Sequence, residues 1–245
     1  MENLAETNDQ STKETSETEN KVKPVLFDAR ATQRIAFEVR QDNEKYDAAH
    51  NLKPLSDERY LEFVRAVDIS ATAEDVAAQT KTAAESLWTD LIGEVENFEL
   101  SEGEELKDAI EFGEKSQVLS VFLACVAVEP DKTTGKRKSV KSDRQTITTE
   151  MLFNGLPIAQ THVLQASSDE WRKKFDRIQR KRFKEEPTKG LRREPKFIYT
   201  SQDEAVGALY DEMLIESSGF AHDTPLRAKT TVVYYAFAST FDAKK

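Results

Sequence analysis

Two stretches of the chain alternate apolar and polar residues, and each precedes segments whose apolar residues recur at helical spacing. In residues 25–40 an apolar triplet and a polar turn lead into an alternating stretch that ends at Val39. Such alternation is typical of a half-buried β-strand. Residues 150–165 repeat the arrangement around Asn154 and Gly155, a pair that favours tight hairpin turns. The pattern predicts a β-hairpin in each half of the chain.

Hydroxyl residues mark the starts of the helices that we expect after each hairpin. A Ser or Thr side chain can accept a hydrogen bond from an amide of the first helical turn, which otherwise has no partner. The candidate N-cap residues are Ser56, Thr72, Ser168 and Ser201.

Each half is predicted to contain a short helix, a longer helix and a final helix. The longer helices are expected over residues 73–98 and 201–220, each with one apolar stripe. The final helices are expected within 104–128 and over 224–241, where apolar residues lie on almost every side. We expect the stripes to form core, with a groove for a helical client as the alternative.

Two further segments are too polar to build a core. Residues 1–24 have almost no apolar side chains and are predicted to be a disordered acidic tail. Residues 129–146 have the composition of a solvated linker. These boundaries predict a first hairpin-plus-helices unit over 25–128 and a second over 147–245.

The two units resemble each other in sequence, and the matching stretches occur in the same order. We interpret this as a duplication, the alternative being chance similarity between amphipathic helices. The predicted fold is α+β and predominantly helical, a tandem repeat of a β-hairpin followed by about three helices. The matches are residues 25–28 with 151–154, 56–63 with 168–175, 83–98 with 205–220, and 115–124 with 229–238.

Charge is distributed unevenly along the 245 residues, whose formal net charge is −10. Residues 131–196 hold 18 Lys and Arg against 9 Asp and Glu, so the remainder of the chain is strongly acidic. Such polarity favours self-association or an oppositely charged partner, with two solvated faces as the alternative. No apolar run is long enough to cross a membrane, and the polar start lacks a secretory signal, so a cytoplasmic location is expected.

The sequence nominates no catalytic, metal or cofactor site. His50, His162 and His222 lie in no metal-binding pattern, and His162 is expected to be a packed or surface residue. Cys125 lies in an apolar run, which favours a small core residue over a nucleophile. Phosphate-binding and nucleophile motifs are also absent from the sequence, so we predict a non-enzymatic protein without cofactors.

Basic residues of one predicted helix and the loop after it form the candidate partner-binding surface. An acidic protein is favoured over nucleic acid, because the whole chain is acidic and would repel DNA at long range. A merely solvated face is the alternative. The candidate residues are Arg172, Lys173, Arg177, Arg180, Lys181, Lys184, Arg192 and Arg193.

Each half opens with a short apolar pattern that leads into its first helix. In the first half the residues are Ile35, Phe37, Val39, Leu52, Pro54, Leu55 and Ser56, leading into 57–67. In the second half they are Ile158, His162, Val163 and Leu164, leading into 168–178. These starts resemble those of phage tail assembly chaperones, which open with a short hairpin and a leucine/proline, serine step into a helix.

This resemblance implies a protein that binds the tape-measure protein during tail assembly, often as an oligomer, and is absent from the finished particle. Two other functions remain open. One is a structural component of a virion or injection machine that docks through its hairpins by strand addition. The other is a nucleic-acid-binding protein that uses the basic helix over 168–184.

Overall fold

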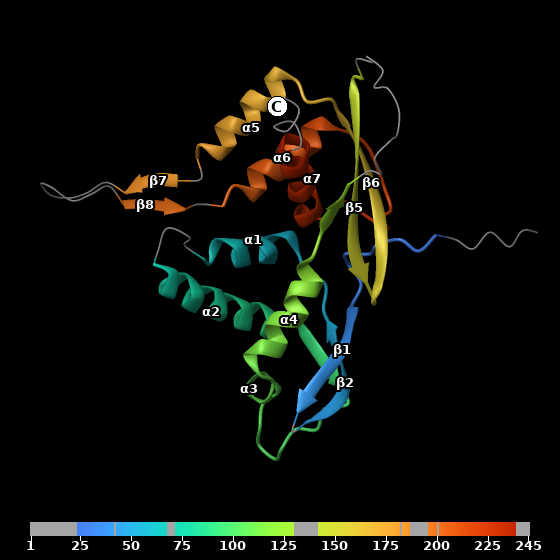
Figure 1. Ribbon diagram of the computed structural model, residues 1–245, viewed down its shortest axis with the longest axis vertical. Helices are drawn as coiled ribbons and strands as arrows, with labels where there is room; N and C mark the ends of the chain where they lie inside the picture. Colours follow the sequence, from blue (N-terminus) through green and yellow to red (C-terminus); the bar gives the residue numbers. More distant parts are fainter. Residues whose placement is uncertain are drawn as a thin grey trace, which may run out of the picture.

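The computed structural model describes residues 24–41, 43–67, 72–129, 142–181, 183–186, 196–199 and 201–238. It is 44% helical and 29% strand, with two antiparallel sheets of three and four strands. The prediction of a predominantly helical fold is therefore wrong, because strands form a large share of both halves. Figure 1 shows the two sheets one above the other, with the helices packed on one side of them.

The first half builds the three-stranded sheet in the order β1-β2-β3. Asn43, with a φ of 65°, turns the chain between β1 and β2. The strands are β1 (Gln33–Gln41), β2 (Glu44–Leu52) and β3 (Ile92–Glu96). The helices are α1 (Asp57–Arg65), α2 (Ala73–Leu91), α3 (Leu106–Ala109) and α4 (Phe112–Leu123).

The second half builds the four-stranded sheet in the order β4-β5-β6-β9, and a separate two-stranded ribbon. Its strands are β4 (Val126–Val128), β5 (Arg144–Phe153), β6 (Leu156–Gln165) and β9 (Leu214–Ser218). The ribbon consists of β7 (Phe183–Glu186) and β8 (Lys196–Tyr199). The helices are α5 (Asp169–Gln179), α6 (Asp203–Met213) and α7 (Leu226–Ala238).

Strand register repeats between the halves. Ile35 of β1 pairs with His50 of β2, and Ile147 of β5 pairs with His162 of β6. In each half the second hairpin strand also pairs with a strand that directly continues a helix, β3 after α2 and β9 after α6. Both of these pairings shift register just before a leucine, Leu52 or Leu164. The hairpin and the strand that follows the longer helix are thus paired in the same way in the two halves, whereas α3 is found in the first half and the β7–β8 ribbon in the second.

The longer helices predicted over 73–98 and 201–220 are too long. They end at Leu91 and Met213, and the following residues become β3 and β9. The apolar spacing fits either structure, but the free edge of the hairpin needs hydrogen-bond partners, which only an extended chain supplies. Left-handed residues end the two strands, Asn97 with a φ of 57° and Gly219 with a φ of 93°.

Residues 25–28 do not form the first strand of a hairpin, so this part of the prediction is wrong. Phe27 instead makes a parallel bridge with Phe220 of the second half. Its N–H donates to the Gly219 carbonyl at 2.9 Å, and its carbonyl accepts from Ala221 at 2.9 Å. Phe27 is 0% exposed. The burial of its side chain in the second half, rather than the polar turn that follows it, therefore determines where residues 25–28 lie.

The remaining local predictions have mixed outcomes. Ser56, Thr72 and Ser168 are confirmed as N-caps, whereas Gln202 rather than Ser201 precedes α6. The hairpin turn at Asn154 and Gly155 is confirmed by their φ angles of 52° and 78°. The helix predicted within 104–128 is divided into α3, α4 and β4. The predicted tail, except Pro24, and most of the predicted linker lie outside the described residues.

Both apolar stripes that were candidate client grooves are core. In α2 the side chains of Leu87 and Trp88 are 0% exposed, and in α6 Leu209 and Tyr210 are no more than 2% exposed. The α2 stripe packs against α4 and the first sheet, and the α6 stripe packs against α7 and the second sheet. Neither stripe can therefore receive a client without unfolding its half.

We expect Trp88→Ala and Tyr210→Ala each to lower the free energy of unfolding by about 3–5 kcal/mol, because each leaves a large cavity in a packed core. Urea denaturation at neutral pH measures this. Phe98→Ala is the control, since Phe98 is 38% exposed and its truncation should change stability by only about 0.5 kcal/mol. A similar loss in all three variants would contradict the assignment.

Candidate functional site

An equivalent histidine lies in the core of each half, against an aromatic residue of the helix behind it. In the first half the Trp88 Nε1 donates to the His50 Nδ1 at 3.2 Å. In the second half the His162 Nδ1 lies 2.7 Å from the Tyr210 hydroxyl oxygen. Both histidines are 0% exposed. Of the two positions expected for His162, packed or at the surface, the structure has the packed one.

Lysines complete the two clusters. The Lys115 Nζ lies 5.0 Å from the ring centroid of Trp88, and the Lys229 Nζ lies 5.9 Å from that of Tyr210. Each lysine makes a cation–π contact with the aromatic residue at the same position in its half. Helices α4 and α7 therefore occupy equivalent positions. Because the rings and histidines have partners and no exposure, we interpret both clusters as structural.

The two histidines differ in their second partner. An indole N–H can only donate, so the His50 Nδ1 is the acceptor and its Nε2 faces Glu114 Oε1 at 2.8 Å. The His162 Nε2 instead lies 2.9 Å from the Thr149 hydroxyl oxygen. Burial lowers the pKa of His162 to about 4, with no carboxylate in these contacts to offset it.

We expect His162 to destabilise the protein below about pH 6.5. The folded state keeps the ring neutral down to its pKa of about 4, while the unfolded chain binds a proton near pH 6.5. The contribution of His162 to the free energy of unfolding is therefore full above pH 6.5 and is about 2 kcal/mol smaller at pH 5. Urea unfolding at pH 7.5 and 5.0 should show a smaller pH dependence for His162→Gln than for the wild type.

A buried arginine joins the two halves. Arg227 is 6% exposed, and its guanidinium carbon lies 5.6 Å from the ring centroid of Phe27 and 5.1 Å from that of Phe122. Burial lowers its pKa to about 10, so it remains charged at neutral pH. Next to it the Leu226 N–H donates to Asp57 Oδ1 at 2.8 Å. This contact region fixes α7 against the first half.

Cys125 lies close to this arginine and is half-buried. Burial raises the pKa of its thiol, which therefore stays protonated at neutral pH. A protonated thiol is a poor nucleophile, which agrees with the expectation of a core residue.

The predicted basic surface is only partly described. Helix α5 exposes Lys173 and Arg177, and Arg180 and Lys181 follow it at the surface, while Arg172 is half-buried. The opposite side of α5 packs on the second core through Trp171, Phe175 and Ile178. The side chain of Lys184 and residues Arg192 and Arg193 lie outside the described residues. A partner for this surface stays a prediction.

Strand β1 has an open outer edge, a feature that sequence reasoning missed. It is an end strand of the three-stranded sheet and pairs only with β2 within the described part of the chain. The Arg34 N–H points away from β2, because it donates to the side-chain oxygen of Asn154 at 2.8 Å. Alternate residues of a strand face the same way, so the backbone groups of Ala36, Glu38 and Arg40 also face outward.

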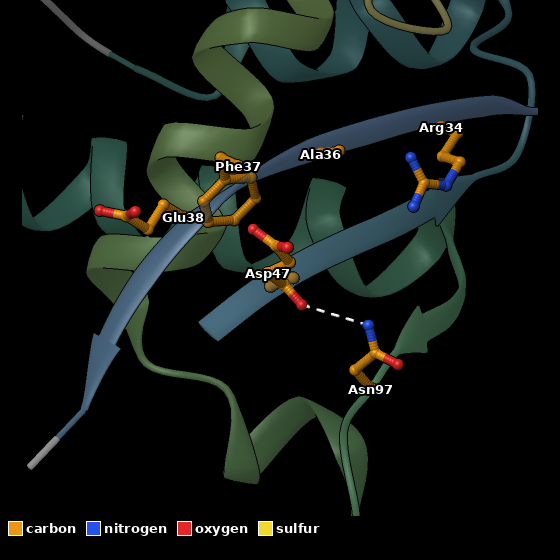
Figure 2. A pocket seen from close by; sticks show the side chains of 7 residues that line it. Arg34, Ala36, Phe37, Glu38, Asp47 and Asn97 are labelled. Atoms are coloured by element: carbon orange, nitrogen blue, oxygen red, sulfur yellow. Dashed lines mark hydrogen bonds between the residues drawn. The ribbon is translucent and has the colours of Figure 1, made fainter. Parts of the chain in front are cut away.

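A shallow depression of about 370 Å³ lies on the face of the same sheet, lined by residues of β1, residues of β2 and Asn97 after β3. Figure 2 shows Arg34, Glu38, Asp47 and Asn97 around it, with Ala36 between them on β1. The Asn97 side chain donates to the Asp47 carbonyl at 3.3 Å, which fixes the end of β3 to β2. Arg34 and Glu38 therefore place opposite charges on either side of Ala36, whose small side chain leaves space above the sheet.

Arg34 is held in place beside the depression. Its Nε and Nη2 donate to Glu96 at 2.9 and 2.7 Å, a bidentate ion pair. The hydrogen bonds from Arg34 and Asn51 lower the pKa of Glu96 to about 2, so this carboxylate is ionised at neutral pH. The pair stiffens the beginning of β1. The arrangement can hold an added polypeptide strand, and its residues include no nucleophile with a positioned base.

Other classes of site find little support in the described residues. Among them, no group of three or more His, Cys, Asp and Glu side chains is placed to hold a metal ion. None of the helices in that part of the chain is long and apolar enough to cross a membrane. Comparisons with protein-family models, with curated proteins and with solved structures found no match.

Proposed function

We propose that the protein is a non-enzymatic assembly protein that binds an extended segment of another polypeptide along the outer edge of β1. The observation that carries this proposal is the row of outward backbone groups at Ala36, Glu38 and Arg40, which lacks a partner in the described chain. An added strand would satisfy these groups.

The resemblance at the start of each half makes a phage tail assembly chaperone the form of assembly protein that we favour. In that case the partner is a segment of the tape-measure protein, and the chaperone acts in the cytoplasm of the host cell. The burial of both helical stripes changes the expected mode of binding. A client would be held at a sheet edge rather than in an apolar groove.

The same edge also supports the second candidate, a structural component of a virion or injection machine. Strand addition would then join the protein permanently to a neighbour. Purified particles distinguish the two functions, since a chaperone is absent from them and a structural component is present in stoichiometric amount. The basic face of α5 is the feature that supports nucleic-acid binding, and a lack of DNA binding at low salt would remove that function.

We expect Ala36→Pro to reduce binding of tape-measure peptides at least about tenfold, because proline removes an outward N–H that an added strand needs. The change spares the β1–β2 ladder, since the Ala36 N–H faces away from β2. Fluorescence anisotropy with overlapping peptides of the tape-measure protein from the same genome measures the effect.

Ala36→Val is the matched control, because it changes the same side chain and keeps the N–H. It should bind within about twofold of the wild type, the range expected of an exposed substitution. Equal binding by both variants, with unchanged circular dichroism, would show that the edge of β1 is not the binding site.

A further inference from the structure

Strand β4 leaves the half to which its helix belongs. Helix α4 packs in the first core, yet β4, which starts three residues after its last residue Leu123, joins the sheet of the second half. It covers the outer edge of β5 by pairing Val126 with Glu150, Ala127 with Thr149 and Val128 with Thr148. The chain after the last helix of one half thus closes an edge of the other half.

The equivalent edge of the first half is the one that remains open. Ile35 and Ile147 occupy the same register position, each paired with the buried histidine of its hairpin. Residues 148–150 of β5, which β4 covers, therefore correspond to residues 36–38 of β1. These are the residues whose outer edge has no partner strand in the described part of the chain.

The segment that corresponds to β4 is also identifiable. Lys115 of α4 and Lys229 of α7 both lie over the ring of the equivalent aromatic residue. In that alignment Val126–Val128 correspond to Thr240, Phe241 and Asp242, which follow α7 in the sequence. Thr and Phe favour strands, and Asp242 would lie opposite Ala36.

We infer that residues 240–242 of a second copy of this chain pair with Ala36–Glu38 of β1, as β4 pairs with β5 within one chain. We assign the segment to a second copy because α7 ends beside α5, where Phe237 stacks on Phe175. Figure 1 shows α5 and the C-terminus at one end of the molecule and β1 towards the other. This inference rests on the proposed function, because it names a partner for the same edge. The expected register sets Thr240 opposite Glu38.

Disulfide trapping between two differently tagged full-length variants tests the inference. Both carry Cys125→Ser, one carries Glu38→Cys and the other Thr240→Cys. Directly paired antiparallel residues have Cα atoms about 5.5 Å apart, within the range of a disulfide. Mixing in a glutathione buffer should give a mixed cross-linked dimer about tenfold above the control pair, as expected for thiols held at high effective concentration.

The control pair replaces Glu38→Cys with Lys45→Cys, an exposed residue on the strand that already has partners on both sides. Adding Ala36→Pro to the Glu38→Cys chain should return the yield to the control level. A yield equal to the control would overturn the inference. So would a link within one chain when a single chain carries both cysteines at high dilution.

Failure of this inference is distinguishable from failure of the proposed function. If trapping fails while Ala36→Pro still abolishes binding of tape-measure peptides, the second copy is not the partner and the strand-binding edge stands. If trapping succeeds and Ala36→Pro leaves peptide binding unchanged, self-association stands and the client-binding function is refuted.

Discussion

The fold depends on one feature that is found in both halves. The chain passes directly from a helix into a strand, and that strand pairs with the edge of a hairpin. Helices α2 and α6 stop so that β3 and β9 can pair with the second strands of the two hairpins. Without those strands, the outer backbone groups of β2 and β6 would lack hydrogen-bond partners beside a packed core. The position of Gly93 agrees with this close approach, because a side chain there would meet the Asn51 carbonyl at 3.2 Å.

This conversion also positions the buried polar clusters. Trp88 and Tyr210 lie in the last turn of their helices, so the helix end that starts the third strand directs an aromatic side chain toward the paired hairpin. His50 and His162 receive that side chain from the middle of the sheet. In each half the hydrogen bond between the histidine and the aromatic side chain links the sheet to the helix, at the point where the backbone changes from helix to strand. Packing and strand pairing therefore support each other in both halves.

Local signals predicted what depends on neighbouring residues. Three N-caps and the turn at Asn154 and Gly155 need only a few adjacent side chains, and all four are correct. The ends of the longer helices depend on a partner strand that is distant in sequence, and residues such as Ile92 and Val95 fit a helix or a strand equally well. The destination of Phe27 and the open edge of β1 are also non-local. The sequence therefore predicted the basic face of α5 but missed the edge that carries the proposed function.

An exposed strand edge favours aggregation, because it offers unpaired backbone groups to any extended polypeptide. The corresponding edges of the two halves differ. In the second half β4 covers β5, while in the first half Arg34, Glu38 and Arg40 alternate along the open side of β1. Charges of both signs discourage indiscriminate pairing but admit a strand whose charges complement them. Since the halves share the pairing of their hairpins and their buried clusters, this difference at the edge is the basis of the proposed binding function.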